Sequence, residues 1–425
     1  MVANNLVISL KFIDSKKFFF GVIFFSFFSY SNLSFGQLIN FEKIAEFSQD
    51  SIKSIWAKSK IPKFVSPVNN GVTIYHVNYY THWIDGSKIK ASGRYYVPTI
   101  DAEYPLVIYN HGTRIKKVRP NILGGESKIC LIFCVDGYGV ISPDYIGLGE
   151  GDKQHLYLHM ESEADAGIDF LLAIKELDSI LNVNRRKELF ITGYSQGGHA
   201  AMSLHKKIER DYSDNIKITA SAPMSGPYNL SGVQGELMFR EYTQPHYLPY
   251  LLNGLNLAYN IWPKESYYKI YKSPYDSIIP KLFDGNHKIK AINNALPKVP
   301  VDILKPELVS VYLNQPDYIV HKLLKKNDVS NWKPIAPIQM CYCEGDEEVL
   351  YENAILTKKN MDALGAKNIR ARSAGKRFGH NKCAGFSVIY TKYYFDSFLK
   401  GSKKGRKGPV LKRFLLSVYK LFIKK

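Results

Sequence analysis

Short apolar blocks with the spacing of buried strands recur along the chain and alternate with longer blocks of helical spacing. Residues 72–98 predict two long strands joined at Asp85-Gly86, a dipeptide typical of tight hairpin turns. Further strands are predicted within YPLVIYNHG, YGVISPDY, ELFITGYS, KITASAPMSG, IAPIQMCYCEGD and NIRARSAG, and helices over 161–177, 200–209 and 349–364 among others. This alternation predicts an α/β fold, with a mostly parallel central sheet that is flanked by helices on both faces.

The alternation is interrupted once, between about residues 228 and 332. This stretch is rich in tyrosine, leucine and proline and continues no strand–helix pattern. An unstructured loop of this length is uncommon inside a compact domain. We therefore predict a helical lid or cap inserted into a single domain that spans residues 37–399.

The first 36 residues differ from the rest of the chain. Lys16 and Lys17 precede an apolar block at 18–28, and Ser34 and Gly36 then offer small residues for cleavage. This order is typical of a secretory signal peptide and predicts an exported protein. An uncleaved membrane anchor is the alternative, although the apolar block is short for a membrane span.

An exported chain permits disulfides, and this chain has five cysteines, which allow one or two bridges. Their spacing leaves the pairing open. It also lacks the usual C-x2-C pattern of zinc sites.

The charge of the chain is concentrated at its C-terminal end. The formal net charge is +19, and residues 400–425 contain ten lysines or arginines and no acid. A nucleic-acid enzyme would spread its basic residues over the fold among stacking aromatic side chains, so no nucleic-acid partner is predicted.

The same tail has an amphipathic pattern from Pro409 onward. On a helical wheel one side carries Leu411, Phe414, Leu415, Val418 and Phe422, and the other carries Arg413, Ser417, Lys420 and Lys424. A basic amphipathic helix of this kind predicts binding to an anionic membrane surface. A solvated tail, or one packed against the domain, is the alternative.

A serine stands between glycines in the sequence ITGYSQGGHAAM, directly after a predicted strand and before a predicted helix. Gly193 and Gly197 flank Ser195 at the spacing of a nucleophile elbow, the sharp strand-to-helix turn that lifts a serine clear of a sheet. Glycine at both positions lets neighbouring backbone pass closely. An ordinary glycine-rich turn has the same pattern, so the motif needs partners elsewhere in the chain.

A serine nucleophile requires a histidine to take its proton and a carboxylate to orient that histidine. Asp346 directly follows a glycine after one predicted strand, and His380 follows the next strand. The order Ser195, Asp346, His380 is that of α/β-hydrolases. The alternative acids on the same loop are Glu344, Glu347 and Glu348. Three other histidines precede the acid and fall inside the insertion, which makes them poor candidates for the base: His246, His287 and His321.

The oxyanion of such a reaction needs two N–H donors that are in place beforehand. The residue after the nucleophile, Gln196, is expected to supply one from its backbone. The loop after the strand LVIYN contains His111-Gly112-Thr113, and we expect the backbone N–H of Thr113 to supply the other.

These motifs together resemble those of the secretory lipase family of the α/β-hydrolase superfamily. The similar segments are YNHGT, SPDYIGLGEG, GYSQGGHAA, CEGDEEV and GHNKC, in the same order, over about residues 71–399. The resemblance implies a secreted serine ester hydrolase with an inserted lid and supports Ser195, Asp346 and His380. One difference is that Asp346 follows the loop glycine directly, without two intervening residues. The basic tail lies outside the resemblance.

We therefore predict an exported carboxylic ester hydrolase that acts on a small-molecule or lipid-like ester and needs neither a metal nor an organic cofactor. A serine peptidase with the same triad and a non-catalytic surface-binding protein on the same scaffold are the alternatives. His155 and His159, with acids nearby, could form a metal pair. Without a third ligand we interpret them as hydrogen-bonded structural residues.

Overall fold

The computed structural model describes residues 37–399 except 60, 62–65, 118–123 and 264–266, together with residues 415, 416 and 418–420. The predicted leader, residues 1–36, and most of the predicted tail lie outside the described residues.

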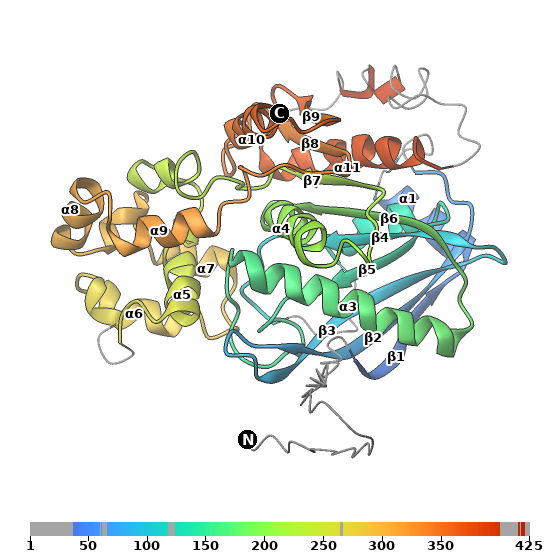
Figure 1. Ribbon diagram of the computed structural model, residues 1–425, viewed down its shortest axis with the longest axis horizontal. Helices are drawn as coiled ribbons and strands as arrows, with labels where there is room; N and C mark the ends of the chain where they lie inside the picture. Colours follow the sequence, from blue (N-terminus) through green and yellow to red (C-terminus); the bar gives the residue numbers. More distant parts are fainter. Residues whose placement is uncertain are drawn as a thin grey trace, which may run out of the picture. The chain divides into compact units, whose positions relative to one another are not determined.

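A single twisted sheet forms the centre of the described chain (Figure 1). Its nine strands are β1 (Leu38–Phe47), β2 (Gly71–His82), β3 (Lys88–Thr99), β4 (Tyr104–Asn110), β5 (Gly139–Pro143), β6 (Arg185–Tyr194), β7 (Ala220–Met224), β8 (Ile338–Cys343) and β9 (Ile369–Gly375). They are ordered β1-β2-β3-β5-β4-β6-β7-β8-β9. The strands from β5 to β9 pair in parallel, and β1, β2 and β3 form an antiparallel edge. The predicted mostly parallel sheet is therefore confirmed.

Helices cover both faces of the sheet (Figure 1). One face carries α1 (Gln49–Lys58), α2 (Ser127–Cys134) and α11 (His380–Asp396), and the other carries α3 (Met160–Leu181), α4 (Gln196–Asp211) and α10 (Glu352–Ala363). Strands β4, β5 and β7 are buried along their whole length, as their continuous apolar sequences predict for central strands.

The predicted hairpin at Asp85-Gly86 joins β2 to β3, and Gly86 adopts a φ of +81° that favours glycine. Strand β1 was not predicted. It is an edge strand with charged residues at Glu42, Lys43 and Glu46, and its residues are half-buried or exposed. Charges of this kind protect an edge from pairing with another chain, and they also remove the alternating pattern that identifies a strand.

The interruption in the alternating pattern forms helices between β7 and β8 (yellow and orange in Figure 1). They are η1 (Gly235–Phe239), α5 (Tyr247–Tyr259), η2 (Tyr267–Ile270), α6 (Tyr275–Leu282), α7 (Ile289–Asn294), η3 (Pro300–Ile303), α8 (Pro306–Asn314) and α9 (Ile319–Lys326). The apolar cluster around Tyr271 and Ile303 consists of insertion residues. The one around Leu255 and Ile292 also includes Ile115, Tyr157 and Leu158, so it joins the insertion to the rest of the domain. The role of the insertion as a lid stays a prediction.

The few described residues of the tail pack against the domain. Leu416 is fully buried in the apolar cluster that includes α11. The Nζ of Lys420 donates to the hydroxyl of Tyr390 at 2.8 Å and also to the carbonyl oxygen of Ala374. This part of the tail therefore follows the alternative of packing against the domain, and Lys420 does not lie on a free polar face. Within the described ranges, no helix combines the length and apolar character needed to cross a membrane.

Candidate active site

Ser195 occupies the turn between β6 and α4 in a backbone conformation that residues other than glycine rarely adopt. Its φ is 61° and its ψ is −123°, and a positive φ is disfavoured for any residue with a Cβ. Its N–H donates to the carbonyl oxygen of Met224 on the neighbouring strand at 3.0 Å, and its carbonyl accepts from the N–H of Gly198 at 2.8 Å. The turn is thus held by backbone hydrogen bonds on both sides.

The flanking glycines are needed because backbone segments meet closely there. A Cβ at Gly193 would lie 2.1 Å from the carbonyl oxygen of Gly197, and one at Gly197 would lie 1.9 Å from that of Asn110. No side chain fits at either distance. The glycine spacing around Ser195 therefore has the physical cause that the sequence predicted.

Asp346 and His380 form a buried pair at the carboxyl end of the sheet. Asp346 lies on the loop after β8, and His380 is the first residue of α11. The Nδ1 of His380 is 2.9 Å from both Oδ1 and Oδ2 of Asp346. Oδ1 also accepts the backbone N–H groups of Glu348 at 3.1 Å and Val349 at 2.9 Å, which fix the carboxylate.

The surroundings of His380 favour its protonated form. Burial is the largest single cause and lowers its pKa, but the hydrogen bond and charge of Asp346, with the charges of Glu348 and Glu347, outweigh it and raise the pKa above its ordinary value. A histidine beside a fixed carboxylate is a stronger base, because the imidazolium that forms is stabilised.

Ser195 and His380 are both nearly buried, with 6% and 5% of their surfaces exposed. Within the described residues, Nε2 of His380 makes no hydrogen bond with Ser195 and instead faces Oε2 of Glu348 at 3.9 Å. Hydrogen bonds between base and nucleophile are often formed only once a substrate is bound.

The loop that follows β4 passes directly beside Ser195. A Cβ at Gly112 would lie 3.6 Å from the Cβ of Ser195 and 3.2 Å from the carbonyl oxygen of Tyr194. The N–H of Gly112 donates to Oε2 of Glu126 at 2.9 Å, which fixes the loop. Among the described residues, the backbone N–H groups of Thr113 and Gln196 have no protein acceptor, so both predicted oxyanion donors remain available.

The side chain of Gln196 is held by a buried polar network that the sequence did not predict. Its Nε2 donates to Oε1 of Glu163 and to Nε2 of His155, each at 2.8 Å. The other oxygen of Glu163 lies 2.7 Å from Nδ1 of His199. The signal that could have revealed this network is Glu163, an acid on the apolar face of a helix that packs on the sheet.

His155 is a structural residue of this network. Burial lowers its pKa and keeps the ring neutral, and its Nδ1 lies 2.9 Å from the carbonyl oxygen of Ile146. His159 caps α3 by accepting the N–H of Ser162 at 3.3 Å. In the part of the chain that the structure describes, no group of three or more His, Cys, Asp or Glu side chains is arranged to hold a metal ion.

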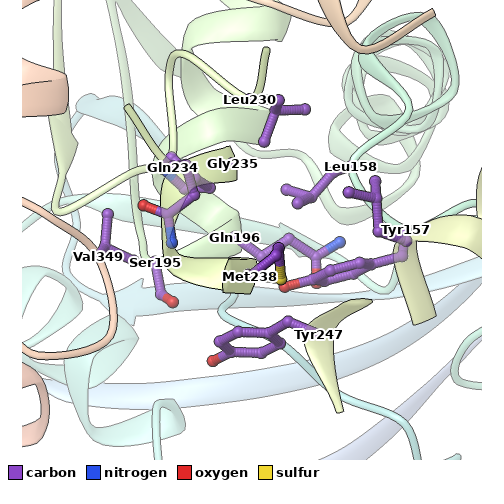
Figure 2. Close-up of a pocket in the computed structure, with 12 residues that line it drawn as sticks. Tyr157, Leu158, Ser195, Gln196, Leu230, Gln234, Gly235, Met238, Tyr247 and Val349 are labelled. Atoms are coloured by element: carbon purple, nitrogen blue, oxygen red, sulfur yellow. The ribbon is translucent and has the colours of Figure 1, made fainter. Parts of the chain in front are cut away.

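An apolar cavity opens beside Ser195, with an empty volume of about 460 Å³ (Figure 2). Its wall combines Ser195 and Gln196 with residues of the insertion, including Tyr247, Met238 and Leu251. A second cavity of about 610 Å³ lies within the insertion. The two cavities share the wall residues Leu230, Gly235, Met238 and Leu251.

No family model and no curated protein matches the chain. The comparison with known proteins therefore rests on solved structures. A Legionella pneumophila protein that is provisionally described as a hydrolase is 27% identical, with a TM-score of 0.80, over 87% of this chain and 100% of its own. The rice cell wall degrading esterase LipA from Xanthomonas oryzae is 24% identical, with a TM-score of 0.72, over 84% and 95%. Candida antarctica lipase A is 15% identical, with a TM-score of 0.64, over 88% and 84%.

These structures confirm the predicted fold, because the likeness extends over most of both chains in each case. The chain has the α/β-hydrolase fold, and the solved structures that it resembles are of the hydrolase, esterase and lipase type.

Proposed function

Since the chain has the α/β-hydrolase fold in a form similar to esterases and lipases, we propose that it is a serine hydrolase that cleaves carboxylic esters. The observation that carries this proposal is the pair of 2.9 Å contacts between Nδ1 of His380 and the carboxylate of Asp346, at the same carboxyl end of the parallel strands as the strained Ser195 turn. Nucleophile, base and acid follow one another along the chain in the order of this fold.

The proposed mechanism proceeds through an acyl-enzyme. Oγ of Ser195 attacks the ester carbon while Nε2 of His380 takes its proton, and Asp346 stabilises the imidazolium. The backbone N–H groups of Thr113 and Gln196 donate to the oxyanion. His380 then protonates the leaving alcohol, and a water molecule that it activates releases the acid. No step uses a metal or an organic cofactor.

The apolar cavities support an ester with a hydrocarbon acyl chain as the substrate. The acyl part would lie against Leu251 and Met238 and continue into the cavity of the insertion. None of the described residues that line the first cavity is charged. A site that selected peptides by their amino group would need an acid there, so a peptidase has less support.

The cellular place of the reaction is part of the proposal. The leader at 1–36 would direct export, and Cys343–Cys383 is a disulfide, as an exported protein permits.

The remaining basic residues of the tail would bring the enzyme to anionic membranes, at about 1 kcal/mol for each lysine or arginine near the surface. Deleting residues 400–425 would then weaken co-sedimentation with anionic vesicles, and high salt would do the same.

The test is hydrolysis of matched substrates by the wild-type protein and by Ser195→Ala. We expect the wild-type protein to hydrolyse esters faster than matched aminoacyl amides. The rate of ester hydrolysis should fall on the order of 10⁴- to 10⁶-fold in the variant. A fluorophosphonate probe should label the wild-type protein at Ser195. A folded variant that keeps a tenth of the activity would contradict the triad, and a protein without activity or labelling would be a non-catalytic binding protein.

A further inference from the structure

Glu348 is a buried carboxylate beside the proposed base. It lies two residues after Asp346, and 8% of its side chain is exposed. Its Oε2 is 3.9 Å from Nε2 of His380, whereas Asp346 contacts Nδ1. The imidazole of His380 therefore lies between two carboxylates, one near each ring nitrogen.

Among the described residues, four hydrogen bonds join the insertion to Glu348. Gln244 Nε2 donates to its Oε1 at 2.9 Å, and the hydroxyl of Tyr247 donates to its Oε2 at 3.1 Å. Gln234 Nε2 and the hydroxyl of Tyr242 donate to its backbone carbonyl oxygen at 2.9 and 2.5 Å. The two donors to the carboxylate are neutral, so they hold it in place without adding a positive charge beside it.

We propose that Glu348 is a second carboxylate for the base: it faces Nε2 of His380 and stabilises the imidazolium that forms when Ser195 gives up its proton. This inference rests on the proposed serine-hydrolase function. Glu348 acts through His380 and is therefore a positioning residue. Because Gln244 and Tyr247 belong to the insertion, the insertion fixes this charge and thereby sets the strength of the base.

The position of Glu348 distinguishes it from the other groups that face His380. Glu347 accepts the backbone N–H of His380 at 3.0 Å, and the ring of Tyr194 on β6 lies 4.9 Å from the imidazole, centroid to centroid. Burial lowers the pKa of His380, and Asp346, Glu348 and Glu347 raise it. Glu348 approaches the nitrogen that exchanges the proton with Ser195, so its charge acts where the reaction needs it.

The experiment removes the charge and keeps the shape. Glu348→Gln is compared with Glu344→Gln, which makes the same charge change at an exposed position of the same loop. The pKa of His380 is read by NMR titration of its imidazole in a Ser195→Ala background, and kcat/KM is measured against pH with Ser195 intact. The NMR readout does not depend on activity.

We expect Glu348→Gln to lower the pKa of His380 and to move the acid limb of kcat/KM to lower pH by about one pH unit, since a nearby opposite charge has effects of this order. With a lower pKa, more of His380 stays in its neutral, basic form at acidic pH. Glu344→Gln should move both far less. Tyr247→Phe removes the hydrogen bond that holds Oε2 of Glu348 near Nε2 of His380, so the carboxylate is held less firmly and both should shift in the same direction by a smaller amount.

The inference is overturned if Glu348→Gln moves the pKa of His380 no more than Glu344→Gln does. An equal loss of activity at every pH, with the pKa unchanged, would mean that Glu348 only fastens the insertion. Should Glu348→Gln fail to fold, an unchanged pKa in Tyr247→Phe would overturn the inference. Failure of the proposed function is seen separately, as activity that survives Ser195→Ala.

Discussion

Cys343 and Cys383 form a disulfide that joins the strand before Asp346 to the helix that begins at His380. Each cysteine lies three residues from its neighbour in the proposed triad, and the two Cα atoms are 5.8 Å apart. The bridge closes a loop with a sequence separation of 40 residues that contains α10 and β9. Acid and base are therefore covalently tied to one another, in addition to their hydrogen bonds.

Replacing both cysteines by serine should lower stability and loosen the acid–base pair. Loss of a loop constraint of this size costs about 2–4 kcal/mol of unfolding free energy. We expect urea denaturation to show a loss of unfolding free energy of this size. We also expect kcat to fall by a larger factor than KM rises. Cys341→Ser, on the same strand with its thiol outside the bridge, is the control. If the double variant matches this control in both measurements, the bridge has no positioning role.

The acid of the triad can be identified by comparing neighbouring carboxylates. Asp346→Asn should lower kcat by about 10⁴-fold, because an amide at this position selects the wrong tautomer of His380. Glu347→Gln should lower it far less, since an amide oxygen can still accept the backbone N–H of His380. Steady-state kinetics on one ester measures both. A large loss in Glu347→Gln with a small loss in Asp346→Asn would reverse the assignment.

The sequence predicted those parts of the fold whose signals are local. The Ser195 turn, the hairpin at Asp85-Gly86 and the central strands each follow from short patterns and are present in the structure. Strand β1 was missed because a half-buried, charged edge strand has no strong alternation.

Other features depend on contacts between distant segments and could not be predicted. The pairing of Cys343 with Cys383 requires β8 and α11 to be adjacent. From the sequence, Glu348 is only an alternative acid for the triad. Its partners Gln244 and Tyr247 belong to the insertion, more than a hundred residues earlier, and no local pattern shows these contacts. Glu163 lies on a helix far from Gln196 in the sequence, and only the packing of α3 on α4 brings them together.

A pair of glycine substitutions tests the close contact beneath Ser195. Gly197→Ala would place a Cβ 1.9 Å from the carbonyl oxygen of Asn110, so we expect a loss of both stability and activity. Gly385→Ala, on α11, meets nothing within 4 Å and should stabilise the protein by about 1 kcal/mol through helix propensity. Thermal unfolding and ester hydrolysis report both effects. A fully stable and active Gly197→Ala would contradict the geometry of the turn.

The final prediction concerns the two cavities and the acyl chain. Leu251 lines both, so Leu251→Trp should fill space where the two cavities adjoin. Each buried CH₂ contributes about 0.8 kcal/mol, so wild-type kcat/KM should rise with acyl length until the cavities are full. In the variant this rise should stop at a shorter chain, with acetate esters unaffected. Leu313→Trp, at an exposed position of α8, makes the same change outside the cavities. An equal loss on short and long esters, or an unchanged length profile, would exclude these cavities as the acyl site.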